Sequence, residues 1–384
     1  MTDKPFLKIT NLSAAYNHKS TVVSDINFGL NEGELGCLLG PSGCGKTTIL
    51  RAISGFQNLQ SGSISLAGNV ISKPNSMVAP EQRNVGMVFQ DHALFPHLSI
   101  VENISFGLHT LTHQERATRV ASVVELVGMQ DYVDQYPHEL SGGQSQRVAL
   151  ARAIAPQPKL LLMDEPFSNL DTELRESLGH EVRGLLKKLG ITAIMVTHDQ
   201  HDAFALGDKI GVISQGKLIQ WDSAFNLYHE PKSRFVANFI GDGLFIAGEI
   251  TGTSTITTSF GEVHGKIINA DGFFEKNADD SCQENADDSC QESADGSYTK
   301  DTGGAYGKID ILIRPDDVKH DPESSIRGKI VRKAFKGAQT LYTITTNSDD
   351  ILMSLLPSHE NYEIGEVIGL SIDADHLVCF AKQI

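Results

Sequence analysis

The spacing of apolar and polar positions along the chain changes character near residue 240. Before that point, short continuous apolar runs alternate with stretches of helical periodicity, which predicts buried strands separated by helices. The segments 6–9 and 22–28 instead alternate apolar and polar residues, which predicts antiparallel strands ahead of the first buried run. The buried runs fall at 35–39, 85–90, 159–166 and 191–198. Strands that alternate with helices indicate a mostly parallel sheet covered on both faces, so we predict an α/β domain over residues 1–240.

From about residue 241 onward, Thr, Val, Ile and Gly become more frequent and short alternating segments recur. These segments are 246–251, 309–314, 328–331, 341–345, 367–372 and 377–380. Alternation of this kind predicts strands rather than helices. We therefore expect a small all-β domain over residues 241–384, with a barrel as its architecture.

An acidic repeat interrupts the predicted β domain. The segment Asn277–Glu284 recurs letter for letter as Asn285–Glu292, and a decayed third copy follows. Between Glu275 and Asp301 the chain carries nine acidic residues and two lysines, a net charge of −7. A segment this polar cannot bury enough apolar surface to order itself, so we predict a disordered insertion over about 275–304.

Composition argues against some classes of partner and cellular setting. Lys and Arg number 32 against 48 Asp and Glu, a net charge of −16. This balance argues against a nucleic-acid partner, because neutralising phosphates requires clustered basic residues. No apolar stretch is long enough to predict a signal peptide or a membrane span. The cysteines lack metal-ligand spacing, which favours a reducing, cytosolic setting; they are Cys37, Cys44, Cys282, Cys290 and Cys379.

The strongest chemical signal follows the first buried run. Its spacing is G-x-x-x-x-G-K-[ST], that of a phosphate-binding loop; the residues are Gly40, Pro41, Ser42, Gly43, Cys44, Gly45, Lys46, Thr47 and Thr48. Glycines let the backbone curl around phosphate oxygens, and the helix that follows adds the positive end of its dipole. We therefore expect Lys46 to reach the β- and γ-phosphates of a nucleoside triphosphate and the Thr47 hydroxyl to bind Mg²⁺.

Further candidate residues stand at the ends of predicted strands and helices. Asp164 and Glu165 end a buried strand, where one carboxylate suits Mg²⁺ and the other suits activation of water. Ser141, followed by two glycines, predicts a capped helix start that also suits an anion. Taken singly, each of these has an ordinary structural explanation, as do the strand and strand-end residues Tyr16, Gln90 and His198.

The order and joint presence of these motifs resemble the nucleotide-binding subunits of ABC transporters. The stretch Leu140-Ser141-Gly142-Gly143-Gln144 is the part most specific to that superfamily, and the likeness runs from about residue 5 to residue 240. It implies a P-loop (RecA-like) ABC ATPase domain with an antiparallel β subdomain and a helical subdomain over about 91–158. The β-rich remainder would be a small OB- or barrel-like regulatory domain.

The resemblance also implies a catalytic arrangement around ATP and Mg²⁺. Gln90 would contact Mg²⁺ and sense a transmembrane partner. Asp164 would hold Mg²⁺, and Glu165 would act as general base for the attacking water. His198 would contact the γ-phosphate, and Tyr16 would stack on the adenine ring.

The same resemblance implies a paired molecule. Two copies would sandwich two ATP molecules head to tail, so that Gly40–Thr48 of one copy faces Ser141, Gly142, Gly143 and Gln144 of the other. Asp171 would link the two sites across the dimer. Ser145 departs from the family pattern, which usually has Gln there, but it lies beyond the phosphate-facing residues and we expect activity to survive. The implied partners are transmembrane permease subunits and, indirectly, a periplasmic substrate-binding protein, with this chain peripheral at the cytoplasmic face of the bacterial inner membrane.

The region after residue 240 resembles the regulatory domain of bacterial importer ATPases of the sugar, polyamine and ferric-iron types. Residues 311–318 match their recurring strand and turn. The patches that look most like ferric-iron subunits are 331–338, 341–343, 356–359 and 375–378. Ferric iron is the expected cargo, with polyamines and sugars or inorganic anions as alternatives.

Two function classes outside transport compete with this interpretation. A DNA-repair or chromosome-organising ABC ATPase would need coiled coils or zinc hooks, and this sequence has neither. A module that only senses ATP should lack either Glu165 or His198, and the chain carries both.

Overall fold

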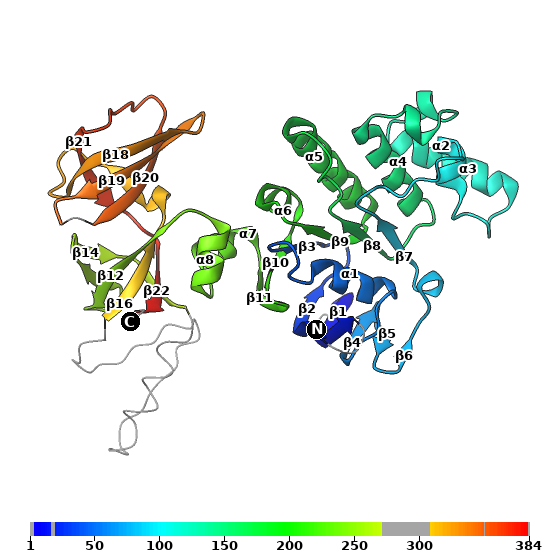
Figure 1. The fold of residues 1–384 in the computed structure, drawn as a ribbon, viewed down its shortest axis with the longest axis horizontal. Coiled ribbons are helices and arrows are strands. Elements are labelled where there is room, and N and C mark those ends of the chain that lie inside the picture. The colour runs from blue at the N-terminus through cyan, green and yellow to red at the C-terminus, as the bar shows by residue number, and fades with distance from the viewer. Residues whose placement is uncertain (1–3, 17–19, 271–307, 349, 383–384) are drawn as a thin grey trace, which may run out of the picture. The chain divides into compact units, whose positions relative to one another are not determined.

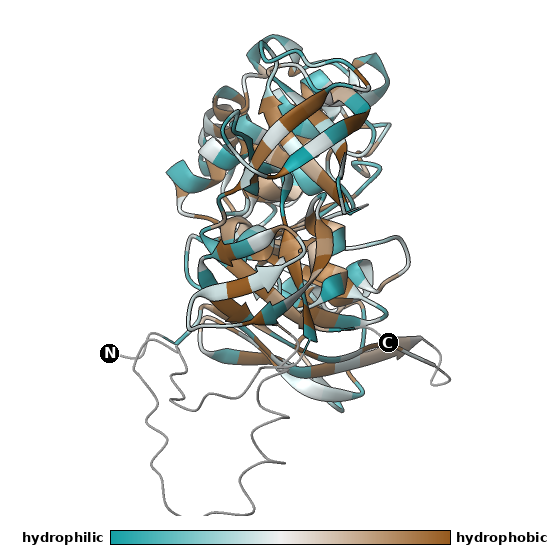
Figure 2. Ribbon diagram, turned by 90° about the vertical axis from the view of Figure 1, so that its left-hand side faces the viewer, coloured by the Kyte–Doolittle hydropathy of each residue, from teal (hydrophilic) through white to brown (hydrophobic). Residues whose placement is uncertain are grey.

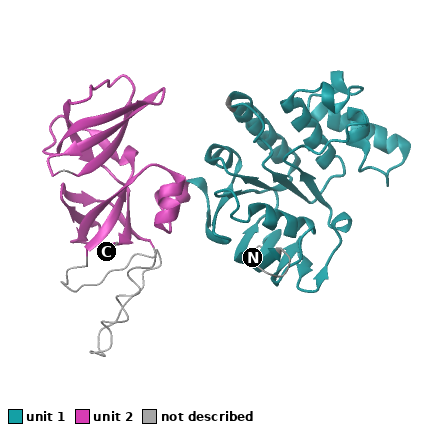
Figure 3. Cartoon of the chain, viewed as in Figure 1, with its two compact units in different colours: residues 1–224 teal, residues 225–384 magenta. Residues whose placement is uncertain are grey.

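The computed structural model describes residues 4–16, 20–270, 308–348 and 350–382. The chain divides into a first unit, residues 1–224, and a second unit, residues 225–384 (Figures 1 and 3). The acidic repeat and its predicted disorder lie outside the described residues, as do Cys282 and Cys290. None of the helices in the described part of the chain combines the length and apolarity that crossing a bilayer demands.

A six-stranded sheet forms the centre of the first unit, in the order β11-β10-β3-β9-β8-β7. Five neighbouring strands run parallel and β11 is antiparallel at one edge. The strands are β3 (Leu35–Leu39), β7 (Val85–Val88), β8 (Leu160–Asp164), β9 (Thr192–Thr197), β10 (Lys209–Ser214) and β11 (Lys217–Asp222). Every residue of β3 and β9 is buried, as expected for parallel strands covered on both faces.

Helices cover both faces of this sheet, which confirms the predicted α/β class (Figure 1). Helix α1 (Lys46–Ser54) packs on β8 and β9, and on its other side it meets β1 and β2. Helix α6 (Gln200–Leu206) packs on β3 and β9 and against α5 (Thr172–Leu189). Ile49, Leu50 and Ile53 of α1 are fully buried, because they lie between the two sheets of the unit.

The antiparallel subdomain is a second sheet in the order β2-β1-β4-β5-β6. Its strands are β1 (Leu7–Tyr16), β2 (Ser20–Leu30), β4 (Ser61–Leu66), β5 (Asn69–Lys73) and β6 (Ser76–Met77). The helical part of the unit comprises α2 (Ile100–Ser105), α3 (His113–Leu126) and α4 (Gly142–Ile154), with short 3₁₀ turns at Pro80–Gln82, Gln130–Tyr132 and Pro137–Glu139. The apolar side of α3 that the periodicity indicated is buried at Val120, Val123 and Val124.

The second unit begins at the second residue of α7 (Ala224–His229), continues with α8 (Arg234–Ile240) and is otherwise built of strands. One sheet has the order β14-β13-β12-β16-β22-β15 and the other β17-β21-β18-β19-β20. Their strands are β12 (Leu244–Ile250), β13 (Thr255–Thr258), β14 (Gly261–His264), β15 (Lys266–Asn269), β16 (Lys308–Ile313), β17 (Val318–His320), β18 (Arg327–Phe335), β19 (Gln339–Thr346), β20 (Ile351–Pro357), β21 (Val367–Ile372) and β22 (His376–Ala381), with a 3₁₀ turn at Pro315–Asp317.

The two sheets of the second unit share one apolar core, to which strands of both contribute. Tyr342 and Ile344 come from one sheet and Ile309 and Ile311 from the other, and all four are fully buried. Figure 2 shows brown, hydrophobic residues alternating with teal, hydrophilic residues along the strands. The predicted all-β domain is therefore confirmed.

The boundary between the units falls at 224/225, which is earlier than the expected boundary at 240/241. The reason is a buried arginine that joins both short helices to the β domain. Arg314 donates to the carbonyl oxygens of Tyr228, Ala237 and Gly241 at 2.9–3.0 Å. Its guanidinium also stacks over the Tyr228 ring at 4.3 Å. Hydrophobic periodicity does not reveal such contacts, because they join residues that lie 73 to 86 positions apart along the chain.

Candidate functional site

The carboxyl ends of four neighbouring parallel strands carry most of the candidate residues. β3 leads into the loop at Gly40, β9 ends before His198, β8 ends at Asp164, and β7 ends two residues before Gln90. In the sheet these strands follow one another in the order β3-β9-β8-β7. The carboxyl edge of an open α/β sheet is where ligands bind, so the fold gathers these side chains where a site is expected.

The loop before α1 needs glycine at two positions for different reasons. Gly45 has a φ of 105° and precedes the first helical residue, a left-handed conformation that only glycine adopts at no cost. A Cβ atom at Gly40 would lie 2.2 Å from the carbonyl oxygen of Ile213, so no side chain fits there. The described structure therefore accounts for the glycine spacing of the motif by backbone conformation and close packing.

The Lys46 ammonium group lies under this loop. It donates to the carbonyl oxygens of Gly40 at 2.7 Å and Pro41 at 3.0 Å, and Lys46 is only 5 % exposed. These bonds hold the loop closed around the charge and keep the ammonium beside the start of α1, where backbone N–H groups already favour an anion. The first turn of α1 carries no acidic residue that would oppose an anionic ligand.

Thr47 and Asp164 supply adjacent oxygen atoms at the same edge. The Thr47 hydroxyl donates to the Asp164 carboxylate at 3.2 Å. Burial raises the pKa of Asp164, its hydrogen bond from Thr47 opposes the shift, and the neighbouring Glu165 charge adds to it. A nearby cation would stabilise the charged form of this half-buried carboxylate and so oppose the rise in its pKa. A hydroxyl and a carboxylate are the hard oxygen donors that Mg²⁺ prefers, so these residues fit that ion.

Glu165 and His198 form a pair next to Asp164. The Glu165 Oε2 atom lies 3.1 Å from His198 Nδ1, and the Glu165 side chain is 21 % exposed against 51 % for His198. Glu165 has a φ of 45°, an uncommon conformation for a residue with a side chain. Its N–H donates to the carbonyl of Val196, and its own carbonyl accepts from the Ser168 hydroxyl at 3.0 Å. These bonds fix the turn that aims the carboxylate at the histidine.

The start of α4 lies against the start of α5. Ser141 accepts from the N–H of Gln144, and the Gln144 side chain accepts from the N–H of Ser141 at 2.9 Å, a capping box. A Cβ atom at Gly142 would meet Leu170 at 3.1 Å, and Leu170 directly precedes Asp171. Asp171 itself caps α5 by accepting from Leu174 at 3.0 Å. Ser141–Gln144 and Asp171 are therefore neighbours within one chain.

One predicted residue is described only through its backbone. Tyr16 ends β1 and pairs with Ser20 of β2, but its side chain lies outside the part of the chain that the structure describes. Its expected stacking on adenine therefore stays a prediction.

Two contacts at the site were not predicted from the sequence. Asn169 donates through its side chain to the carbonyl of Gln90 at 3.2 Å, which joins the segments that follow β7 and β8. Arg175 of α5 donates to the Asp199 carboxylate at 2.8 Å and to the carbonyl of Leu170 at 3.2 Å. Asp199 directly follows His198, and Leu170 directly precedes Asp171. Arg175 therefore links the segment that contains His198 to the start of α5. No periodicity or motif spacing signals contacts of this kind.

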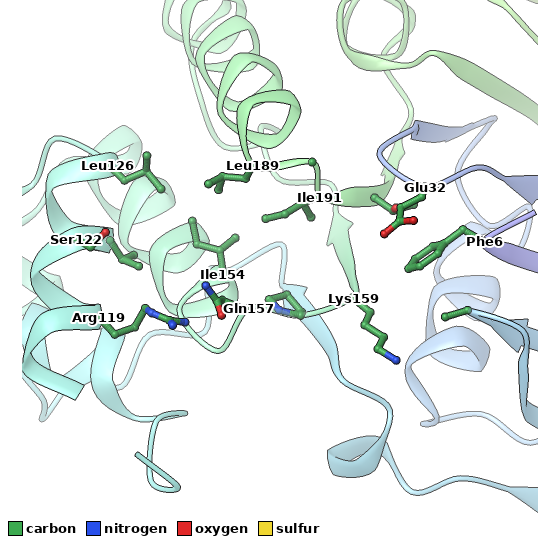
Figure 4. Close-up of a pocket in the computed structure, with 15 residues that line it drawn as sticks. Phe6, Glu32, Arg119, Ser122, Leu126, Ile154, Gln157, Lys159, Leu189 and Ile191 are labelled. Atoms are coloured by element: carbon green, nitrogen blue, oxygen red, sulfur yellow. The ribbon is translucent and has the colours of Figure 1, made fainter. Parts of the chain in front are cut away.

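A cavity of about 730 Å³ opens at the opposite edge of the sheet. Figure 4 shows Leu126, Ile154, Leu189 and Ile191 around part of it, with Arg119 extending from α3 toward Gln157. Lys159, which directly precedes β8, and Thr192, the first residue of β9, also line it. These are the amino ends of strands whose carboxyl ends carry Asp164 and His198, so this cavity is not part of the candidate site.

Comparison with known families agrees with this architecture. Residues 23–168 match the model of the ABC transporter family, and residues 311–380 match that of the TOBE domain. A solved structure of cbiO1 from Clostridium perfringens, part of the ABC transporter complex cbiONQ, has a TM-score of 0.54 and 29% sequence identity. The match covers 58% of this chain and 89% of that one. The molecule is an ABC ATPase with a carboxyl-terminal TOBE domain.

Two similar proteins show the family to which the chain belongs. The Fe(3+) ions import ATP-binding protein FbpC of Haemophilus influenzae (strain 86-028NP) is 41% identical over 265 residues, covering 68% of this chain and 75% of that protein. The spermidine/putrescine import ATP-binding protein PotA of the same strain is 34% identical over 387 residues, covering 96% and 94%. The chain belongs to the family of ABC transporter ATP-binding proteins.

Cys44, inside the phosphate loop, gives the first testable prediction. The residue is 6 % exposed, and burial raises the pKa of its thiol although the Lys46 ammonium at 3.8 Å opposes the shift. A raised pKa leaves little thiolate at neutral pH, so alkylation by a maleimide should be slow at pH 7 and accelerate as the pH rises. Alkylation should abolish ATP binding, and bound ATP should protect the thiol, as measured by mass spectrometry and nucleotide titration.

The background for this experiment is a chain in which Cys282 and Cys290 are replaced by serine. Cys37 and Cys379 are each only 1 % exposed against 6 % for Cys44, and burial also raises the pKa of both thiols, so neither should compete for the reagent. The matched control is Cys44→Ser, which should bind ATP before and after treatment. If alkylated chain still binds ATP normally, Cys44 does not crowd the phosphates.

Proposed function

We propose that the chain is the ATP-hydrolysing subunit of a binding-protein-dependent importer, and that its cargo is ferric iron. The observation that carries hydrolysis is the Glu165–His198 pair at 3.1 Å, beside Asp164 and the phosphate loop. Ferric iron is supported by the similarity to the Fe(3+) ions import ATP-binding protein FbpC, which is 41% identical over 265 residues.

Polyamine import is the second candidate for the cargo, and a specific observation favours it. The spermidine/putrescine relative aligns over 96% of this chain, including the second unit, whereas the ferric-iron relative aligns over 68%. The higher identity, 41% over 265 residues against 34% over 387, supports the first cargo, and the coverage of nearly the full length supports the second. Sugar or inorganic anion import is the remaining alternative.

In the proposed reaction, water attacks the γ-phosphorus of ATP and ADP leaves. Glu165 accepts a proton from the attacking water as the new O–P bond forms, and the bond to the β-phosphate oxygen breaks. The carboxylate can only accept a hydrogen bond, so His198 donates to it from Nδ1. If His198 Nε2 is also to donate a hydrogen bond to a γ-phosphate oxygen, both ring nitrogens must carry a proton. Lys46 adds a second positive charge beside the same oxygens.

A magnesium ion would be held by Thr47, Asp164 and Gln90. The described residues contain no cluster of three or more His, Cys, Asp or Glu side chains suited to a metal. The ion would therefore complete its shell with phosphate oxygens and water, as Mg²⁺ commonly does. When bound, it neutralises charge on the β- and γ-phosphate oxygens.

Two copies of the chain would form the complete site. Helix α4 packs on β7, α2 and α3, while the phosphate loop follows β3. Two strands, β9 and β8, separate β3 from β7, which places the two strands about 14 Å apart. Ser141–Gln144 would thus serve the ATP held by Gly40–Thr48 of the second copy. Asp171, next to Gly142 within one chain, would then lie where the two sites meet.

The remaining assignments follow from this role. The molecule would be peripheral at the cytoplasmic face of the bacterial inner membrane, bound to transmembrane permease subunits and served by a periplasmic binding protein. We assign residues 1–240 to the nucleotide-binding domain, about 91–158 to its helical subdomain, and 241–384 to the regulatory domain; within this division α7 and α8 end the first domain in the sequence but pack with the second unit. Ser145 is half-buried in α4 and is not one of the residues assigned to phosphate.

The test is reconstitution with the permease in lipid vesicles. ATP hydrolysis is measured after adding binding protein loaded with ferric iron, with a polyamine, or with a sugar or inorganic anion, and the unloaded binding protein is the control. Stimulation by the ferric form alone is the expected result. Stimulation by the polyamine form but not the ferric form would overturn the cargo assignment while leaving the ATPase role intact.

A further inference from the structure

The segment after Gln90 contains two consecutive residues in an unusual backbone conformation. His92 has a φ of 62° and Ala93 a φ of 46°, both in the left-handed region. Residues with a Cβ atom adopt this region rarely, and such residues persist only where surrounding contacts hold them. His92 forms a turn by donating from its N–H to the carbonyl of Phe89 at 3.0 Å. Neither residue is a glycine, so the holding contacts must come from elsewhere in the fold.

Those contacts come from a single side chain on α4. Arg152 donates to the carbonyl oxygen of Ala93 at 2.6 Å and to that of His92 at 2.9 Å, using its two terminal nitrogens. The guanidinium also lies 5.4 Å from the centre of the Phe95 ring. A planar fork is suited to two neighbouring acceptors in a fixed geometry, whereas an ammonium group is a single point of charge.

The His92 ring lies beside a second residue of the same helix. The His92 ring is half-buried, which lowers its pKa, and the neighbouring Gln146 side chain of α4 opposes that shift. Gln146 is 1 % exposed, and neither His92 Nδ1 nor Gln146 Oε1 has a hydrogen-bond partner in the described structure, so the two residues are neighbours that are not hydrogen-bonded to each other. On its far side the segment is fixed to α2, because Asn103 accepts from the N–H of Phe95 at 2.9 Å and donates to its carbonyl at 3.1 Å.

We propose that Arg152 is a positioning residue that makes the Gln90 segment and helix α4 move as one body. It acts by holding His92 and Ala93 in the left-handed conformation. The first turn of α4 contains Gly142 and Gly143, so a displacement of Gln90 would carry the proposed ATP-facing start of α4 with it. This inference rests on the proposed function, since it gives Gln90 and α4 their roles at ATP.

The test uses the full-length chain and a second substitution that removes the strain. Arg152→Ala should lower the kcat for ATP hydrolysis about tenfold with KM changed less than about threefold, because the site is misaligned rather than lost. Ala93→Gly in that background should recover at least about threefold of the loss, since glycine adopts the left-handed conformation without help. A role in folding alone predicts no such recovery.

Arg147→Ala is the matched control on the same helix. Arg147 donates to the carbonyl of Val127 at 3.2 Å and pairs with Glu181 at 2.5 Å, so its loss removes a similar number of contacts. It should leave kcat within about twofold. Equal losses in both variants, or no recovery with Ala93→Gly, would overturn the proposal.

A further variant keeps the experiment decisive if Arg152→Ala does not fold. Arg152→Lys retains the charge and the stem but cannot donate to both carbonyls in fork geometry, and Ala93→Gly should rescue it in the same way. Absence of hydrolysis in the unmodified chain would count against the proposed function rather than against Arg152.

Discussion

Replacing Lys46 with alanine should reduce the affinity of the chain for ATP by a factor of roughly a hundred or more. The ammonium group is buried under the phosphate loop and bonded to the carbonyls of Gly40 and Pro41, so it is positioned before any ligand arrives. Hydrogen bonds that involve a charged group contribute about 1.5–3 kcal/mol each, and two lost contacts to phosphate give a loss of this size. Equilibrium titration with a fluorescent ATP analogue measures it.

Lys159→Ala is the control for this experiment. Lys159 is exposed and precedes β8 at the opposite edge of the sheet, so its removal should leave ATP affinity unchanged. Thermal unfolding of both variants separates a binding defect from a folding defect. Wild-type affinity in a folded Lys46→Ala chain would contradict the placement of the phosphates at this loop.

Replacing Glu165 with glutamine should stop turnover while leaving ATP bound. A positioned general base contributes about 10²–10⁴ in rate, and glutamine keeps the shape of the side chain but cannot accept the proton. The change also removes a negative charge beside Asp164, whose pKa that charge raises, so ATP affinity should be equal or higher. Single-turnover hydrolysis and ATP titration measure the two effects separately.

The exposed Glu176 of α5 provides the matched substitution for this prediction. Glu176→Gln removes the same charge from the surface and should hydrolyse ATP at the wild-type rate. Full hydrolysis by the Glu165→Gln chain would contradict the assignment of Glu165 as general base. Loss of ATP binding would show instead that Glu165 stabilises bound ATP.

Much of the fold could be predicted from the sequence, because its strands have clear periodicity. The fully buried runs at β3 and β9 and the alternating runs at β12, β16 and β19 all lie where the pattern placed them. The phosphate loop was predictable for another reason. Its glycines are required by local backbone geometry, which leaves a fixed spacing in the sequence.

The contacts that were missed depend on residues far apart in the chain. Arg152 reaches His92 and Ala93 across about 60 positions, and Arg314 reaches Tyr228 across 86. The left-handed conformations of Glu165, His92 and Ala93 were also missed, because residues with side chains enter that region only when tertiary contacts hold them. Sequence patterns therefore located the candidate residues but not the network that positions them.

The proposed sharing of each ATP site between two copies of the chain is tested most directly by a mixing experiment. Lys46→Ala disables the phosphate loop. Ser141→Asp places a negative charge at the start of α4 and retains a good N-cap residue. Each variant alone should hydrolyse almost no ATP.

A mixture of the two variants contains pairs in which the intact loop of one copy faces the intact α4 start of the other. When equal amounts pair at random, about a quarter of the shared sites are intact. Shared sites therefore predict that hydrolysis returns on mixing, to roughly that fraction of the wild-type rate. A mixture as inactive as its components would contradict the claim and place each ATP site within a single chain.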